Sequence, residues 1–96
     1  MGIDADGRVL IAQNVHVREF DGELVILDLA KGDYFGINEI GARLWRGLEM
    51  GKSCAELARD LATEYDADPG LLLADLVALT DDFIAKGLVV PRASTG

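Results

Sequence analysis

The chain has 96 residues, half of them hydrophobic, and its 9 Lys and Arg against 17 Asp and Glu give a formal net charge of −8. This length suits one domain with a single core. The negative charge repels nucleic-acid phosphates and anionic lipid headgroups, so we expect neither nucleic acid nor a membrane as a partner and favour basic peptides or proteins.

The first third of the chain predicts antiparallel strands. Residues 1–14 are expected to form a flexible segment, although residues 9–12 could add a short edge strand. Val15–Phe20 alternates weakly and predicts a strand. Asp21-Gly22 then predicts a hairpin, because a type I′ turn needs positive φ at both positions. Residues 24–27 are apolar on both faces and therefore predict a central strand.

A third strand is predicted at Asp33–Ile37, interrupted at Gly36, after a turn in which Gly32 takes a left-handed conformation. Asn38 follows as the N-cap of the first helix. So short a strand is expected at a sheet edge, where its backbone donors and acceptors are left for another chain to use. This edge is therefore the first place to look for a function.

Three helices and a short strand are predicted after Asn38. The first helix ends at Gly51, and the third begins at Asp68-Pro69 and stops at Gly87. The second begins at a capping box made by Ser53 and Glu56. Its buried stripe is predicted to contain Leu57, Ala58, Leu61, Ala62 and Tyr65. Residues 88–90 are predicted to form a short strand, or wing, before a disordered tail at 91–96.

These elements predict an α+β fold, in which three N-terminal antiparallel strands are followed by three helices. The spacing of the three short helices is that of a winged helix-turn-helix. The sequence contains no internal repeat and no linker, so we expect one domain over residues 15–90.

Few residues suggest catalytic or metal-binding chemistry. His16 has neither triad partners nor metal-ligand spacing, and we interpret it as a surface residue. Cys54 lies in the first turn of a helix, where the dipole lowers a thiol pKa, but no second Cys can assist it, and we expect a small, semi-buried side chain. We therefore predict no enzyme, no cofactor and no metal. The polar start MGIDADGR holds no signal peptide, so we expect a cytoplasmic protein.

The third helix carries an unusually wide apolar arc. Leu72, Leu76, Leu79 and Phe83 fall on one side of it, and neighbouring apolar residues widen this arc to nearly half the circumference. Either the helix packs between two neighbours, or one margin of the arc lines a groove. Asp75 and Asp82 border the Leu72/Leu79 margin. Since Lys86 is the only cation of this helix, a DNA-reading role is disfavoured.

Most of the chain, about residues 15–90, resembles the PqqD-like proteins. These are small peptide chaperones, or recognition elements, of pathways for ribosomally made, post-translationally modified peptides (RiPPs). The similar segments are DGELVILDLAKGDYFGINEIGARLW, SCAELARDLATEY and DPGLLLADLVALTDDFIAKGLV. The order and spacing of Gly32-x-Tyr34, Asn38, Gly41, Trp45, Asp75 and Gly87-Leu88 carry the resemblance. Around Tyr34-Phe35-Gly36 the chain looks closer to the freestanding recognition proteins of lasso-peptide clusters than to the pyrroloquinoline-quinone member.

The resemblance implies a non-catalytic winged helix-turn-helix domain. It also implies that the leader of a precursor peptide binds as an added strand along the third strand, packed against the third helix. By position, the peptide-binding residues would be Asp33, Tyr34, Phe35, Gly36 and Ile37 on the strand, and Leu72, Asp75, Leu76, Leu79 and Phe83 on the helix. Carboxylates beside apolar surface would select a basic or amide-rich leader with apolar anchors.

The leading hypothesis is a leader-peptide-binding protein that presents a precursor to a separate modifying or protease enzyme, such as a lasso-peptide leader peptidase. One alternative is a peptide chaperone for pyrroloquinoline quinone biosynthesis, and a less favoured one is a winged-helix DNA-binding regulator. A further alternative is a homodimer in which the free edge strand pairs with its own copy.

Overall fold

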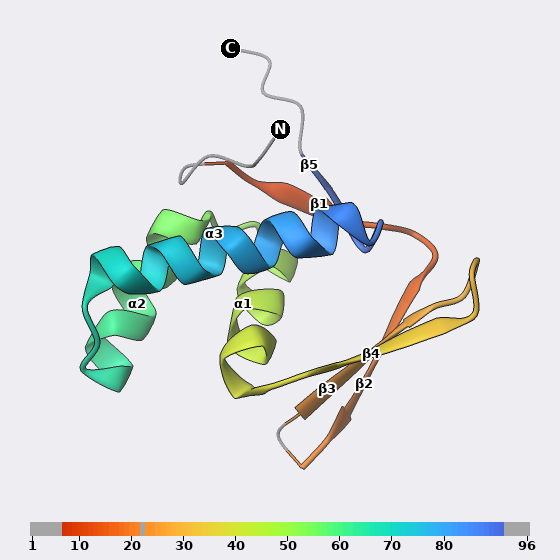
Figure 1. The fold of residues 1–96 in the computed structure, drawn as a ribbon, viewed down its shortest axis with the longest axis horizontal. Coiled ribbons are helices and arrows are strands. Elements are labelled where there is room, and N and C mark those ends of the chain that lie inside the picture. Colours follow the sequence, from red (N-terminus) through yellow and green to blue (C-terminus); the bar gives the residue numbers. More distant parts are fainter. Residues whose placement is uncertain (1–6, 22, 92–96) are drawn as a thin grey trace.

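The computed structural model describes residues 7–21 and 23–91. It confirms the α+β fold class, with antiparallel strands preceding three helices (Figure 1). The elements in chain order are β1 (Val9–Ile11), β2 (Val15–Phe20), β3 (Glu23–Asp28), β4 (Asp33–Ile37), α1 (Glu39–Glu49), α2 (Cys54–Tyr65), α3 (Pro69–Ala85) and β5 (Val89–Pro91).

The three predicted strands form one antiparallel sheet in the order β2-β3-β4. The β2–β3 register runs from Val15 opposite Asp28 to Phe20 opposite Glu23, and Leu24 of β3 lies opposite Ile37 of β4. The prediction that β3 is central and β4 an edge is confirmed. The expected interruption at Gly36 is wrong, because β4 continues through that residue. Asp21 has φ of +49°, as a primed hairpin turn requires, while Gly22 lies outside the described residues.

A second, two-stranded sheet pairs β1 with β5, two segments from opposite ends of the chain. The predicted short strands at both places are thereby confirmed. The flexible segment was predicted to extend too far, to residue 14. Val9 is only 3% exposed and belongs to the core. Pro91 likewise belongs to β5 and not to the tail. Residues 1–6 and 92–96 lie outside the described residues.

The predicted helix starts are confirmed by their capping contacts. The Asn38 side chain accepts a hydrogen bond from the Gly41 amide at 2.9 Å. Ser53 and Glu56 form the reciprocal capping box, and the Asp68 carboxylate accepts the Gly70 amide at 2.8 Å. These local contacts explain why the helices begin where the sequence indicates.

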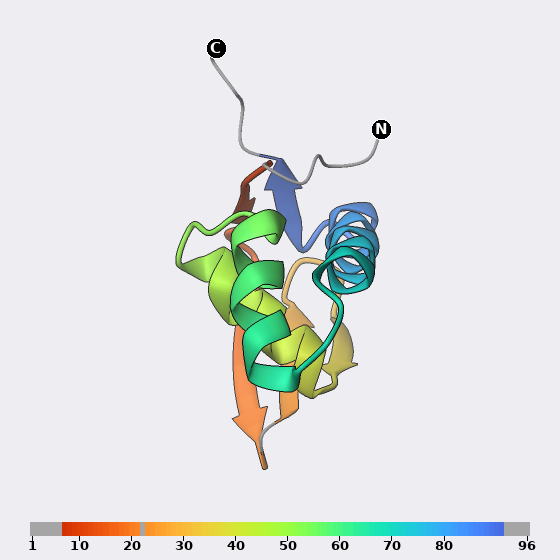
Figure 2. The ribbon, with the colours of Figure 1, turned by 90° about the vertical axis from the view of Figure 1, so that its left-hand side faces the viewer.

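The hydrophobic core lies where the three helices meet the inner side of the sheet. Figures 1 and 2 show α3 lying across α1 and beside α2, while the three-stranded sheet extends away from the helices. Trp45 of α1 is fully buried and meets Phe83 of α3 edge-to-face, with ring centroids 5.4 Å apart. The apolar stripe of α2 is confirmed except for Tyr65. That residue is 36% exposed, and its hydroxyl donates to the Glu39 carboxylate across the surface.

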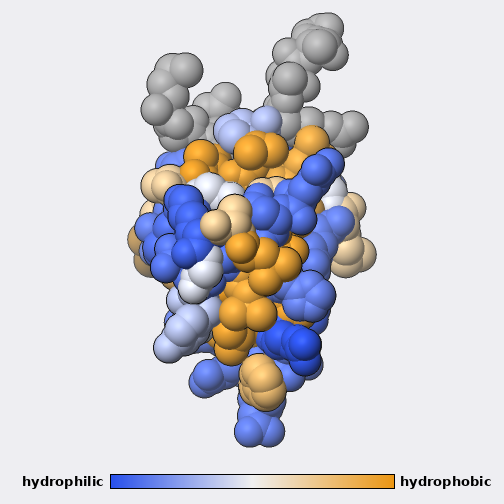
Figure 3. All heavy atoms as spheres, turned by 90° about the vertical axis from the view of Figure 1, so that its right-hand side faces the viewer, coloured by the Kyte–Doolittle hydropathy of each residue, from blue (hydrophilic) through white to orange (hydrophobic). Residues whose placement is uncertain are grey.

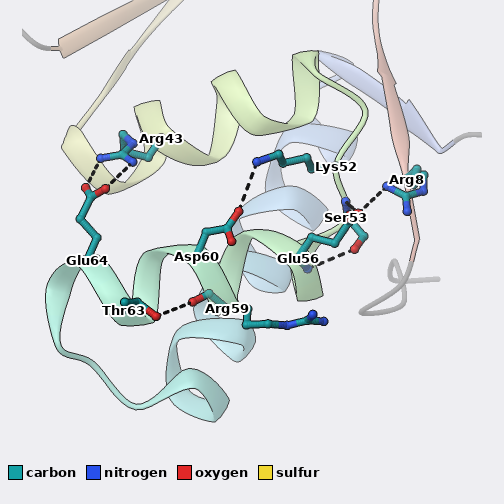
Figure 4. A network of polar contacts seen from close by, with 9 residues as sticks. All are labelled: Arg8, Arg43, Lys52, Ser53, Glu56, Arg59, Asp60, Thr63 and Glu64. Carbon is teal, nitrogen blue, oxygen red and sulfur yellow. Dashed lines mark hydrogen bonds and ion pairs between the residues drawn. The ribbon is translucent and has the colours of Figure 1, made fainter.

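Ion pairs on the helix surface connect α2 to its neighbours (Figure 4). Glu64 of α2 pairs with Arg43 of α1, and Asp60 pairs with Lys52 in the preceding loop. Glu56 accepts the Ser53 amide and the Arg8 guanidinium, which lower the pKa of its carboxyl to about 2. Exposed pairs of this kind are screened by solvent and contribute little to the free energy of unfolding, so the buried core dominates stability.

Candidate functional site

The free edge of β4 presents unpaired backbone groups. The Leu29 amide donates to the Asn14 carbonyl at 2.9 Å, so odd-numbered residues of β3 and its extension bond toward β2. Because bonding direction alternates along an antiparallel strand, the even-numbered residues bond to Asp33, Phe35 and Ile37 of β4. The amides and carbonyls of Tyr34 and Gly36 therefore point outward, where no described strand pairs with them.

A groove separates this edge from α3. Its hollow of about 410 Å³ is bounded on one side by β4 and the start of α1, and on the other by the C-terminal half of α3. The lining residues are Tyr34, Phe35, Gly36, Ile37, Asn38, Gly41, Leu79, Asp82, Phe83 and Lys86.

A second hollow of about 500 Å³ extends the groove toward the middle of α3. It shares Asn38, Leu79 and Asp82 with the first and adds Ile40, Asp75 and Ala78. Leu79 therefore lies on the wall of both hollows. The two hollows share these lining residues, and together we call them the channel.

Charged groups lie along the α3 wall. The Lys86 ammonium lies 5.3 Å from the centroid of the Phe35 ring and pairs with the Asp82 carboxylate one turn earlier. Asp75 is exposed and has no ion-pair partner among the described residues. The channel thus has the Lys86–Asp82 ion pair near Phe35 and the Asp75 carboxylate further along α3, with Leu79 between them.

The structure brings seven of the ten predicted site residues to the channel: Tyr34, Phe35, Gly36, Ile37, Asp75, Leu79 and Phe83. Leu72 and Leu76 are 8% and 0% exposed, belong to the core and line neither hollow, so the structure does not bring them to the channel. Asp33 pairs with Asp28 at the far end of β4 and does not line either hollow.

Sequence reasoning missed several lining residues, namely Asn38, Ile40, Gly41, Ala78 and Lys86. A helical pattern could have found part of this wall, because Asp75, Leu79, Asp82 and Lys86 follow each other at i, i+4, i+7 and i+11. Gly41 is required by a close approach, since a Cβ there would lie 2.4 Å from Ile37 Cγ2.

Neither His16 nor Cys54 contributes to this site. His16 is exposed on β2, as expected. Cys54 is fully buried, not semi-buried, and its Sγ lies 3.3 Å from Thr80 Oγ1 of α3. Burial raises the pKa of the thiol, opposing the lowering expected from the helix dipole. In the ranges that the structure describes, no three His, Cys, Asp or Glu side chains gather as a metal site would require, and no helix is long and apolar enough to cross a membrane.

Comparison with known proteins assigns the family. The model of coenzyme PQQ synthesis protein D (PqqD) matches residues 23–89, which include both walls of the channel. The chain belongs to the PqqD family. No curated protein matches it.

Two solved structures share this PqqD-family fold over nearly their whole length. One is "TbiB1 in Complex with the TbiA(beta) Leader Peptide", which is 32% identical with a TM-score of 0.81. The other is "Lasso peptide synthetase B1 complexed with the leader peptide", which is 26% identical with a TM-score of 0.82. Each match covers 88% of this chain and 99% of the other.

Proposed function

We propose that this PqqD-family chain is a RiPP recognition element that binds the leader of a precursor peptide as a fourth strand along β4. The observation that carries the proposal is the channel between α3 and the outward-pointing backbone groups of Tyr34 and Gly36. Both similar structures are complexes with leader peptides, which supports the same role here. In this proposal the chain binds its peptide and catalyses nothing.

Backbone pairing and side-chain contacts contribute separately to this binding. A guest strand gains affinity from main-chain hydrogen bonds to the β4 edge, and pockets for alternate side chains fix its register. Guest side chains that point inward would contact Leu79 and Phe83, which supply apolar anchoring surface. Asp75 and Asp82 favour basic or amide side chains beside those anchors.

We propose that the chain acts in the cytoplasm and presents its bound precursor to a separate enzyme, such as a lasso-peptide leader peptidase. Because the chain matches the family model of coenzyme PQQ synthesis protein D, the alternative is a peptide-chaperone role in pyrroloquinoline quinone biosynthesis. The two roles are distinguished by which precursor leader binds, because each pathway has its own precursor.

Fluorescence of Trp45 provides a direct binding test. It is the single Trp of the chain and contacts Phe83, which lines the channel, so occupation of the channel should change its emission. We expect saturable titration by a synthetic lasso-type leader peptide from a precursor encoded beside this chain. Leu79→Asp places a charge on the apolar wall and should weaken binding by about 100-fold or more, in line with a buried interface anchor.

Leu71→Asp is the matched control, since it makes the same change on the same helix at a side chain that is 71% exposed and lines neither hollow. Its affinity should stay within about twofold of wild type, as for a surface change away from the site. Saturable binding that Leu79→Asp leaves intact would contradict the proposed site. Absence of binding to leaders of both precursor classes would contradict the function.

A further inference from the structure

A buried carboxylate holds the turn that leads into β4. Asp28, the last residue of β3, is only 2% exposed. Its Oδ1 atom accepts three hydrogen bonds, from Asn14 Nδ2 at 2.7 Å, from the Ala30 amide at 3.0 Å and from the Lys31 amide at 3.2 Å. A charge taken out of water is costly unless hydrogen bonds satisfy it. Burial opposes the ionisation of Asp28, but these three bonds outweigh it and lower the pKa of the carboxyl.

Polar contacts and not side-chain packing fix this turn. Residues 29–32 are all exposed, and Leu29 is 66% exposed. Figure 3 faces this end of the molecule and shows apolar surface open between hydrophilic flanks. Two main-chain bonds add to those of the carboxylate, since the Leu29 amide donates to the Asn14 carbonyl at 2.9 Å and the Gly32 amide to the Asp28 carbonyl at 2.8 Å. We call Asp28 and Asn14 together the turn clamp.

The turn clamp lies where the two walls of the channel meet. β4 begins directly after the clamped turn. The end of α3 lies beside the same turn, since a Cβ at Gly87 would stand 4.0 Å from Lys31 Nζ. The segment that leads to Asn14 is also bonded to this end of α3, because the Ala12 amide donates to the Leu88 carbonyl at 3.0 Å. Figure 1 shows the β3–β4 turn, the β1–β2 link and the end of α3 at one end of the molecule.

The position of β4 matters for the proposed guest strand. Among the described residues, β4 pairs with β3 alone, so nothing beyond its free edge supports it. A guest strand must bond to Tyr34 and Gly36 and contact Leu79 across the channel at the same time. Binding constellations of this kind tolerate errors of only about 0.5 Å. The turn that fixes the start of β4 therefore bears on leader affinity, although neither residue of the turn clamp lines a hollow.

We propose that Asp28 and Asn14 are positioning residues for leader binding. By fixing the turn, they hold the start of β4 at the distance from α3 that the guest strand needs. The inference rests on the proposed leader-binding function and adds to it a pair of residues outside the channel. A chain without the turn clamp would hold β4 in the binding position for only part of the time, and its apparent affinity would fall in proportion.

Three variants, which keep none, two or all three of the bonds to Asp28 Oδ1, form the test. Asp28→Ala keeps none, and we expect the affinity for the synthetic leader peptide in the Trp45 titration to fall by about tenfold or more. Asn14→Ala keeps the bonds from the two turn amides and should lower this affinity by about three- to fivefold. Asp28→Asn keeps an accepting oxygen for all three donors, so its affinity should stay within about twofold of wild type.

Ser53→Ala is the matched control. It removes another buried oxygen that accepts a backbone amide, at the cap of α2 and away from both hollows. Urea unfolding followed by Trp45 fluorescence identifies conditions in which each variant is folded, and the affinities are compared there. A purely structural role of Asp28 would lower the urea midpoint and leave leader affinity unchanged, as we expect for Ser53→Ala. If Asp28→Ala does not fold, Asn14→Ala decides the test, because Asn14 is only half-buried.

The outcomes separate the positioning inference from the proposed function. If wild type binds no leader of either precursor class, the proposed function fails and the inference fails with it. If wild type binds leader and the folded Asp28→Ala and Asn14→Ala variants bind it equally well, the positioning inference is overturned and leader binding stands. Equal losses in Ser53→Ala and Asp28→Ala would also overturn it, since reduced stability would then explain the effect. A loss in Asp28→Asn as large as in Asp28→Ala would overturn it as well, since the charge and not the clamped turn would then matter.

Discussion

The two edge strands of the three-stranded sheet offer the same backbone chemistry but different surroundings. β2 has ionisable side chains at His16, Arg18 and Glu19, and Glu19 is held by Arg46 of α1 at 3.0 Å. β4 has only Asp33 at its start, followed by the uncharged run Tyr34 to Ile37. Charged side chains along an edge discourage pairing with another strand. β2 is therefore a protected edge and β4 an available one.

The second difference between the edges is the wall beside them. β4 faces the C-terminal half of α3 across the channel, so a guest strand there gains side-chain contacts as well as backbone bonds. An exposed edge alone would bind a guest strand through backbone hydrogen bonds but would not fix the register of that strand. The comparison indicates that α3 converts the β4 edge into a specific site, and three changes test it, from the largest expected effect to the smallest.

The largest effect is expected from Leu76→Ala, which removes a fully buried side chain of α3 that lies behind the channel and not in it. Such a core truncation costs about 2–5 kcal/mol, a large share of the stability of a domain this size. Urea unfolding followed by Trp45 fluorescence should show this loss. Leader affinity, measured where the variant is fully folded, should change by less than about threefold. A fall in affinity comparable to that of Leu79→Asp would mean that Leu76 contacts the bound leader as part of the groove wall.

Helix α3 shows which features could be predicted from the sequence and which could not. Its start at Asp68-Pro69 and the cap at Asn38 depend on neighbouring residues, and both were predicted. The apolar arc showed which residues share a side, but not which neighbour covers each. Thr80, one turn after Leu76, meets Cys54 of α2, so this stripe is covered by α2 and belongs to the core.

Long-range pairing explains the other differences. The strand at Val9–Ile11 depends on a partner about 80 residues away at Val89–Pro91, which no local pattern encodes. Lys86 was interpreted only as the lone cation of a helix, because its position over the Phe35 ring requires the packing of α3 beside β4. Elements and caps were thus predictable from local chemistry, while the exact wall of the site required the tertiary arrangement.

An intermediate effect is expected from proline on the two edges. Gly36→Pro removes an outward amide without breaking the β3–β4 ladder, and it leaves a guest carbonyl unpaired, which costs about 1–3 kcal/mol. We expect leader affinity to fall by at least about tenfold in the Trp45 titration. Glu19→Pro removes the corresponding outward amide of β2 and should leave leader affinity unchanged. Equal losses in the two variants would mean that the guest does not distinguish the edges.

The smallest effect is expected from Gly36→Val, which gives β4 a side chain at its one bare position while keeping the amide that Gly36→Pro removes. A Cβ at this position meets nothing within 4 Å, and the backbone is extended, so valine fits without strain. Replacing glycine inside a strand should raise the free energy of unfolding by about 0.5–1 kcal/mol, measured in urea. Gly36 lies opposite Val25, whose side chain points away from the helices, so the new side chain projects from that face of the sheet and leader affinity should stay within about twofold. If affinity instead falls as far as in Gly36→Pro, the leader lies over this face of the sheet at Gly36 and not beside the edge. β4 would then differ from β2 because it lacks a side chain at this position, and not because α3 lies beside it.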